Sequence, residues 1–195
     1  MHSEIRKTIL ETARKLFNEQ GYSKTSMRAI ADECGIAVGN LTYHFHKKND
    51  LVIAIMQDAF VVAKPEGPIL TLFDLTDQFS RMLDTLLRHA FYFIDDEFVG
   101  EQHEHNDEIR KRILSGFDYL IQRGYFSEDF DMDTRQAILN MLLMTHPTWL
   151  RVSIRAQAAS SKAEFLRRHW IILFPYLTEK GKQEYDLIKN QPPLV

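Results

Sequence analysis

The sequence predicts an all-α fold of roughly eight or nine helices. Apolar residues recur at steps of three and four along most of the 195-residue chain, which is the spacing of one helical face. No segment keeps the alternation of apolar and polar residues that marks a half-buried strand. Glycine and proline stand where the helical patterns stop, so they divide the chain into separate helices.

Two helices are predicted before Gly35. The first covers about residues 3 to 20 and stops at Gly21, and the second is capped by Thr25 or Ser26 and stops at Gly35. Both carry apolar residues at helical spacing: Ile5, Ile9, Ala13, Leu16 and Phe17 in the first, and Met27, Ile30, Ala31 and Cys34 in the second.

A third helix is predicted from about Ala37, with Leu41 and Phe45 pointing inward. A fourth begins near residues 49 and 50 and ends near residue 63, where KPEGP, residues 64 to 68, forms the strongest breaker in the chain. We place the domain boundary near this breaker, within the helix before it. The predicted division is residues 1–48, residues 49–190 and a tail of residues 191–195.

The second part of the chain is predicted to form a helical bundle. Amphipathic segments cover residues 70–93, 108–123, 134–158 and 162–176, with Pro147 interrupting the third. The stretch DDEFVGEQHEHND, residues 95–107, is expected to be a polar break, or a surface loop that changes its order on ligand binding.

Composition excludes several classes of protein. Apolar residues make up 45% of the chain, which favours a packed globule over a disordered chain. There is no uncharged apolar run of eighteen residues, and the first twenty residues are rich in charge, so neither a transmembrane helix nor a signal peptide is expected. The single Cys34 cannot form an internal disulfide, and a cytoplasmic location is the simplest interpretation.

Charge is unevenly distributed. Residues 1–50 hold eight Lys or Arg against six Asp or Glu, whereas the remainder holds sixteen against twenty-one. The two parts are therefore expected to meet different partners. A surplus of two positive charges is weak evidence for nucleic acid, so the residue types in the short helices matter more.

The second and third helices form a helix-turn-helix candidate. Ala31 is small enough for a helix crossing, and Gly35 tolerates the turn between them. The exposed face of the third helix can read base edges in a major groove, and phosphates can be held by hydroxyls and amides at the start of the second helix and by Lys48. The candidate DNA-binding residues are Thr25, Ser26, Arg28, Val38, Gly39, Asn40, Thr42, Tyr43, His44 and Lys48.

The segments LFNEQGY and TSMRAIADECGIAVGNLTYHFHKKNDL, within residues 16–51, resemble the DNA-binding signature of the TetR family of bacterial transcriptional regulators. The resemblance implies an all-helical homodimer that binds a palindromic operator in double-stranded DNA, acts as a repressor and is released by a small apolar or aromatic effector. It implies neither enzymatic activity nor a cofactor. Thr42 and Val38 depart from the residues frequent in the family, so base preference cannot be transferred.

The C-terminal part carries no comparable signature. Phe91, Tyr92, Met141, Met144, His146 and Trp149 are candidates for an effector cavity, although such a stripe is also typical of ordinary core. The segment FLRRHWIILFPYL either packs within the chain or forms an isologous dimer interface. The resemblance favours a dimer interface through the last helices, with these candidate residues: Phe165, Trp170, Leu173 and Phe174.

Three alternatives remain. The HEH motif of residues 103–105 invites a metal hypothesis, but its histidines lack the i, i+4 spacing of a helical metal clamp. An enzyme using residues 95–108 with His146 would need a triad or paired acids, which the sequence does not show. A dimeric helical interaction module without sequence-specific DNA binding is the other possibility.

Overall fold

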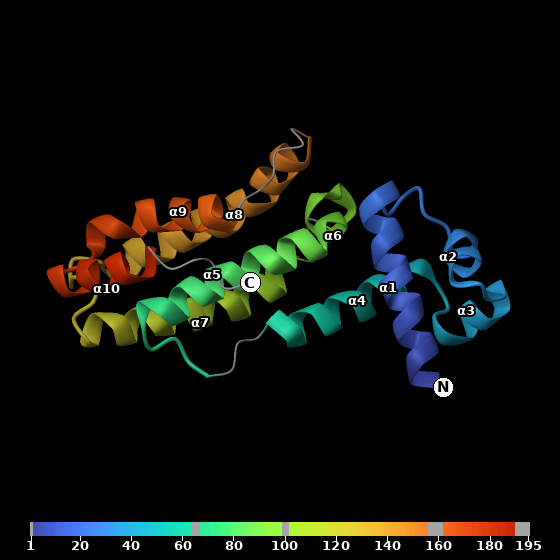
Figure 1. Ribbon diagram of the computed structural model, residues 1–195, viewed down its shortest axis with the longest axis horizontal. Coiled ribbons are helices and arrows are strands. Elements are labelled where there is room, and N and C mark those ends of the chain that lie inside the picture. Colours follow the sequence, from blue (N-terminus) through green and yellow to red (C-terminus); the bar gives the residue numbers. More distant parts are fainter. Residues whose placement is uncertain (1, 64–66, 99–101, 156–161, 190–195) are drawn as a thin grey trace. The chain divides into compact units, whose positions relative to one another are not determined.

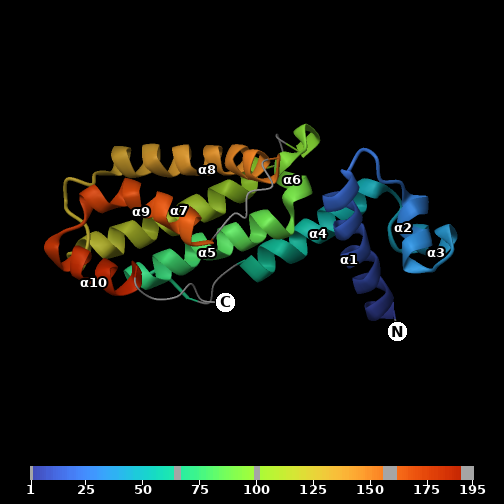
Figure 2. The same ribbon diagram turned by 45° about the horizontal axis from the view of Figure 1, so that its top comes forward.

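The computed structural model describes residues 2–63, 67–98, 102–155 and 162–189. Within these ranges the regular elements are ten α-helices and two short 3₁₀ helices (Figures 1 and 2). The all-α prediction is therefore confirmed. No helix in the described part of the chain is long and apolar enough to cross a bilayer.

The first four helices lie close to their predicted positions. They are α1 (His2–Gln20), α2 (Met27–Cys34), α3 (Val38–His44) and α4 (Lys48–Ala63). The Ser26 hydroxyl accepts a hydrogen bond from the Ala29 N–H at 3.1 Å and so caps α2. Gly35 has a φ of 68°, which glycine adopts without a steric cost, and the chain turns there toward α3.

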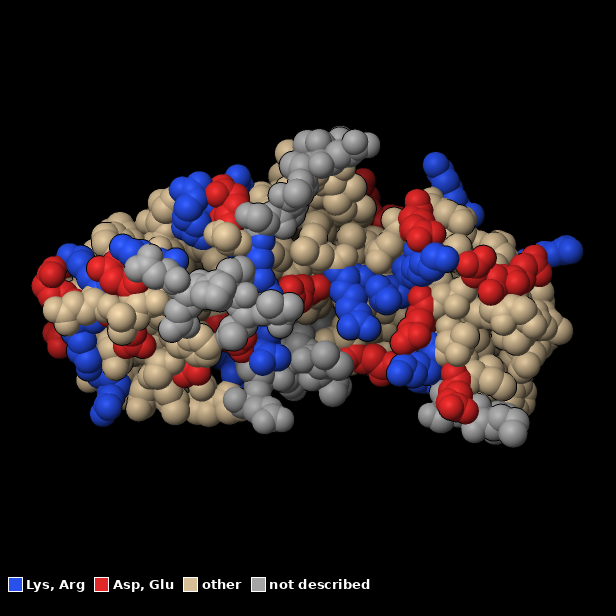
Figure 3. All heavy atoms as spheres, in the orientation of Figure 1, with Lys and Arg blue, Asp and Glu red and all other residues tan. Residues whose placement is uncertain are grey.

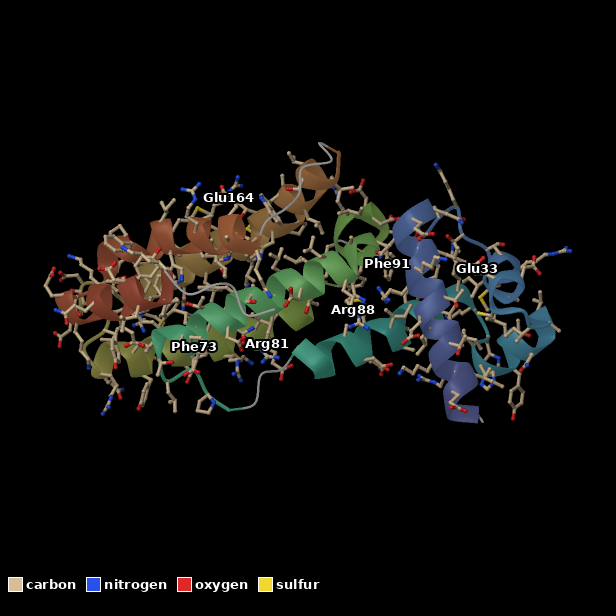
Figure 4. All side chains as sticks on the ribbon, viewed as in Figure 1. Glu33, Phe73, Arg81, Arg88, Phe91 and Glu164 are labelled. Carbon is tan, nitrogen blue, oxygen red and sulfur yellow. The ribbon has the colours of Figure 1, made fainter. Side chains whose placement is uncertain are left out.

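The first compact unit joins α1 to α4 with residues 88–98. These later residues form α6 (Ala90–Ile94) and a 3₁₀ helix (Asp96–Phe98), and their aromatic rings enter the core of the unit. The Phe91 ring lies 5.1 Å from that of Phe17 in α1 (Figure 4), and the Phe98 ring lies 4.9 Å from that of Tyr22. A segment distant in sequence thus completes the packing of the N-terminal helices.

Asn18 of α1 holds the break between α5 (Leu72–Arg88) and α6. Its side-chain amide donates to the Arg88 carbonyl at 2.9 Å, and its side-chain oxygen accepts from the Phe91 N–H at 3.0 Å. The Arg14 guanidinium also donates to the Arg88 carbonyl, at 3.2 Å. Backbone groups that lose their helical partners at the break are therefore paired with α1.

The second compact unit contains α5 up to residue 87, α7 (Gln102–Gln122), α8 (Met132–Arg155), α9 (Lys162–Leu173) and α10 (Glu179–Lys189). Two predictions about its helices are wrong. First, α7 begins at Gln102 inside the expected polar break: polarity suggested a loop, although the Gln and Glu residues in this stretch are good helix formers. Second, α8 continues through Pro147 instead of being interrupted there.

The helix α10 was not predicted. It begins at Glu179 after Thr178, whose hydroxyl accepts from the Gly181 N–H at 3.1 Å and donates to the Gly124 carbonyl at 2.6 Å. The Tyr125 carbonyl lies so close that a Cβ atom on Gly181 would stand 2.1 Å from its oxygen. Close packing against Tyr125 therefore requires a glycine at position 181.

Replacing Gly181 with alanine is expected to lower the free energy of unfolding by roughly 2–4 kcal/mol, because a backbone oxygen cannot yield as a flexible side chain would. Gly39→Ala is the matched control: a Cβ atom there meets nothing within 4 Å, and helix propensity predicts a gain of up to about 1 kcal/mol. Chemical denaturation measures both. Equal stability of the Gly181→Ala variant and the wild type would contradict the close contact.

Candidate nucleic-acid interface

The helix α3 is fixed on one side and open on the other. Leu41 and Phe45 are buried, as predicted, and hold the helix in the core of the first unit. Away from this side Tyr43 is 73% exposed, and Val38, 38% exposed, and Asn40 are exposed on the two flanks of the helix. The structure therefore brings together one aromatic, one aliphatic and one amide side chain on a solvent-facing helix.

Gly39 lies at the centre of this exposed face. A Cβ atom at this position would meet no atom of the protein within 4 Å, so the internal packing does not require a glycine. The Thr42 hydroxyl donates to the Gly39 carbonyl at 3.1 Å, and the His44 ring lies edge-on to that of Tyr43 with the centroids 5.4 Å apart. Gly39 therefore costs α3 stability without serving the internal packing of the chain.

The start of α2 contains two hydroxyl residues in opposite environments. Ser26 is exposed, and it caps the helix whose first N–H groups lack helical partners. Thr25 is 2% exposed, and its hydroxyl donates to the Gly21 carbonyl at 2.9 Å. The Arg28 side chain is exposed and lies 4.0 Å from the carboxylate of Asp32. Ser26 and Arg28 are thus open to a phosphate, and Thr25 is not.

Lys48, the first residue of α4, is turned toward the loop between α1 and α2. Its ammonium group donates to the Tyr22 carbonyl at 2.7 Å and to the Thr25 carbonyl at 3.1 Å. The same nitrogen lies 3.9 Å from the centroid of the Tyr22 ring. The sequence predicts a phosphate contact for this lysine at the start of the fourth helix, and the structure shows contacts within the protein that the sequence could not reveal.

The six residues predicted for an effector cavity do not form one group. Phe91 and Tyr92 belong to the core of the first unit, so they are removed from that set. Met141 and Met144 of α8 are 47% and 77% exposed, which does not suit the lining of an enclosed cavity. Only His146 and Trp149 contact the interior of the second unit, where their rings lie 5.1 and 5.2 Å from that of Phe165.

The residues predicted for a dimer interface also need correction. Phe165, Trp170 and Leu173 are buried within the second unit, and the Trp170 indole donates to the Thr76 hydroxyl at 3.2 Å. For these three the intramolecular alternative is right, because their stripe faces neighbouring helices of the same chain. Phe174, at 39% exposed, is the only one of the four that remains open.

A buried pair of histidines joins α8 to α9. The His169 Nδ1 lies 2.8 Å from the Phe165 carbonyl and must donate to it, so its Nε2 is left to accept from the His146 Nε2–H at 3.0 Å. Burial lowers the pKa of His169 to about 4, and burial together with the adjacent ring lowers the pKa of His146 well below its usual value. Both rings are therefore neutral near pH 7. No sequence spacing pointed to His169.

No group of three or more metal-ligating side chains occurs among the side chains that the structure describes. The HEH motif lies in the first turns of α7, but its side chains are outside the described part. Asp107, which follows the motif, pairs with Arg110.

Comparison with known proteins adds to this geometry. Residues 9–55 match the family model of bacterial regulatory proteins of the tetR family. An HTH-type transcriptional regulator of Staphylococcus aureus (strain bovine RF122 / ET3-1) is 46% identical over 54 residues. That match covers 28% of this chain and 29% of the relative, so sequence similarity is confined to the N-terminal helices.

The whole fold has counterparts among solved structures. A TetR-family transcriptional regulator from Marinobacter aquaeolei VT8 superposes with a TM-score of 0.80 at 23% identity, over 94% of this chain and 96% of the other. The complex of SmeT with triclosan gives 0.65 at 16% identity, over 91% and 94% of the two chains; SmeT is the repressor of a multidrug efflux pump of Stenotrophomonas maltophilia. Residues 9–55 thus match the N-terminal segment of tetR-family regulatory proteins, and the chain shares its all-helical fold with solved TetR-family structures.

Proposed function

We propose that this protein is a transcriptional regulator that binds double-stranded operator DNA by inserting α3 into the major groove. The observation that supports this proposal most directly is the open position at Gly39. The glycine lowers the stability of α3, yet a side chain there would meet no atom of the protein within 4 Å, so the space is available to a base pair. The regulators that share the N-terminal sequence support the same function. Asn40 and Thr42 are the proposed base readers, with Val38 offering an apolar contact to a thymine methyl group.

Phosphate contacts are assigned to the exposed groups around α3. Ser26 and the N-terminal amides of α2 are proposed to hold one phosphate, with Arg28 beside them. Tyr43 and His44 at the end of α3 can donate to the backbone on the other side of the groove. These contacts fix how α3 sits in the groove but do not select a sequence.

The protein is proposed to act as a homodimer through α8 and α9. The described surface of α8 presents Met141, Met144 and Val152 along one stripe, and α9 and the turn after it present Ile171 and Phe174. On α9 the same stripe carries Glu164 (Figure 4), which pairs with Arg167 and Arg168. Figure 3 shows basic and acidic side chains next to one another on the surface of this unit. An apolar stripe bordered by charges is typical of an isologous interface.

Repression with release by a small molecule is the proposed mode of regulation. SmeT, which shares the fold, is a repressor and binds triclosan. In the present chain the aromatic interior around Trp149, Phe165 and His146 is where we place a small apolar or aromatic effector. Two connections can carry a change to the N-terminal helices: α4, and residues 88–98 that Asn18 holds against α1.

Selection of duplexes from a random-sequence pool tests the DNA-binding function. A palindromic site is expected, since two copies related by a two-fold axis read two half-sites. Asn40→Ala is expected to relax the preference at one base pair of each half-site, at a cost of about 1–3 kcal/mol per contact. Gln20→Ala, on the exposed end of α1, is the control and should leave the selected site unchanged.

Failure to enrich any sequence would contradict sequence-specific binding. The alternative of a dimeric interaction module would then be favoured. If a site is found, release of the bound duplex by small aromatic compounds checks the effector part of the proposal.

A further inference from the structure

We propose, on the basis of the effector response proposed above, that the second unit binds an aromatic molecule whose neutral ring hydroxyl lies between His146 and His169. These residues form the buried pair that joins α8 to α9, and the two helices run side by side (Figures 1 and 2). Apolar side chains of the same shape can fill an interior equally well, so packing alone does not account for two polar rings here.

The pair presents one donor and one acceptor to each other. The Phe165 carbonyl holds the proton of His169 on Nδ1 at 2.8 Å, so the His169 Nε2 is left as an acceptor. It accepts from the His146 Nε2–H across 3.0 Å. His169 is 2% exposed and His146 is 6% exposed, so both rings are shielded from bulk water. A group that separates the two rings must therefore replace both halves of this hydrogen bond.

A neutral hydroxyl replaces both halves through a single atom. Its oxygen accepts from the His146 Nε2–H, and its proton is donated to the His169 Nε2. Two hydrogen bonds of about 2.8 Å to one oxygen place the nitrogens roughly 4.5 Å apart, so the rings must separate by about 1.5 Å. A carboxylate only accepts and an ammonium only donates, so each leaves one histidine nitrogen unpaired.

The charge state of the pair selects against acids. A carboxylate gains a second donor if His169 takes up a proton, but burial lowers the pKa of His169 to about 4. Burial and the neighbouring ring lower the pKa of His146 in the same direction. Near pH 7 both rings therefore stay neutral, and a neutral hydroxyl is favoured over a carboxylate.

Aromatic rings surround the pair. The centroid of the His169 ring lies 4.4 Å from that of Phe165 and 4.5 Å from that of Phe79 of α5. The Trp149 ring lies 5.2 Å from that of Phe165. Aromatic rings pack favourably against one another at such distances, so the body that carries the hydroxyl is expected to be aromatic.

Pro147 gives α8 a weak point beside the pair. Proline has no N–H, so the Leu143 carbonyl receives no helical hydrogen bond from position 147. The missing bond lowers the cost of bending α8 between His146 and Trp149, whose rings both contact Phe165. Such a bend moves the His146 ring away from α9 and supplies the separation that the hydroxyl needs.

Equilibrium dialysis at pH 7 with three ring-matched compounds tests the class of ligand. 2-Naphthol carries the hydroxyl, 2-methylnaphthalene has a methyl group of similar size in its place, and 2-naphthoate has a carboxylate. We expect 2-naphthol to bind at least about tenfold more tightly than either of the others, since only 2-naphthol pairs both histidines. No binding of 2-naphthol, or equal binding of 2-naphthol and either other compound, would overturn the proposal.

A double variant locates the preference at the pair. His146→Leu/His169→Leu removes both polar rings together, so no buried nitrogen is left unpaired, and this variant is expected to bind 2-naphthol and 2-methylnaphthalene equally tightly. His46→Leu is the matched control at an exposed histidine of the first unit and should keep the wild-type preference. A double variant that also keeps this preference would show that the hydroxyl binds elsewhere, against the proposal.

Nitrogen NMR of the wild-type imidazoles does not depend on whether the double variant folds. Addition of 2-naphthol is expected to shift the Nε2 signals of His146 and His169 and to leave those of His46 unchanged. The spectrum of His146→Gln identifies the signals of the pair. Unshifted signals of the pair at saturating 2-naphthol would contradict the proposed site.

None of these measurements uses DNA, so the site and the DNA-binding function can fail separately. If the wild type binds no duplex while 2-naphthol shifts the signals of the pair, the proposed DNA-binding function fails and the site stands. If the wild type binds its duplex and 2-naphthol is not preferred over 2-methylnaphthalene, the site is overturned and the DNA-binding function stands.

Discussion

Glutamate in place of Met144 is expected to give a folded monomer whose affinity for the operator is at least about 100-fold lower than that of the wild type. Met144 is 77% exposed on α8, so the substitution costs a single chain little. In an isologous interface the substitution enters from both protomers, so two carboxylates would be desolvated without cationic partners. Loss of the second reading head removes an avidity gain of about 10²–10⁴.

Sedimentation velocity and operator binding measure the two parts of this expectation. Met132→Glu is the matched control. Met132 is 40% exposed on the same helix, but it lies nine residues before Met141 and so on the side of α8 opposite to Met141. The control should remain dimeric and bind normally. A dimeric Met144→Glu protein with wild-type affinity would place the interface on another surface.

The N-terminal helices were predictable because local chemistry defines them. Ser26 caps α2 and Gly35 ends it within the same short segment, and buried Leu41 on α3 is followed four residues later by Phe45, which caps the end of that helix. These interactions join residues that are close in sequence, so they can be predicted without knowledge of the rest of the fold. The resemblance of this segment to a known family rests on the same residues.

The wrong predictions concern apolar residues whose packing partner lies far away in the sequence or in a second copy of the chain. The spacing of Phe165, Trp170 and Leu173 correctly predicts a buried stripe. Spacing does not indicate whether the same chain or a second copy covers that stripe. Likewise the aromatic residues near Phe91 were assigned to the bundle, although the structure packs them on α1. These contacts join segments more than seventy residues apart, beyond any local pattern.

Close packing and hydrogen bonding explain the remaining differences. No pattern in the sequence predicted α10, and this helix needs Gly181 because the Tyr125 carbonyl lies against it. Thr25 has the chemistry of a phosphate ligand, but its hydroxyl donates to the Gly21 carbonyl of the preceding loop. Residue type indicates what a group can bind, and the fold decides which partner is within reach.

Acidification is expected to destabilise the protein strongly between pH 6.5 and about pH 4. His169 and His89 each have a pKa lowered to about 4, mainly by burial, and for His89 also by the nearby Arg14 and Arg88. His146 shifts in the same direction. The histidines of the unfolded chain take up protons as the pH falls through about 6.5, while these rings stay neutral in the folded protein. Their contribution to the free energy of unfolding is therefore fully present above pH 6.5 and is lost as the pH falls toward 4.

Each buried histidine is expected to cost about 2 kcal/mol of unfolding free energy between pH 7 and pH 5. His146→Gln tests the contribution of the pair: the amide can still donate to His169, but one titrating group is gone. Urea denaturation of this variant should therefore show about 2 kcal/mol less loss over that interval. His46→Gln, at an exposed position, should show the wild-type loss. An unchanged pH dependence in His146→Gln would mean that the ring is already charged in the fold, which its burial in an apolar interior argues against.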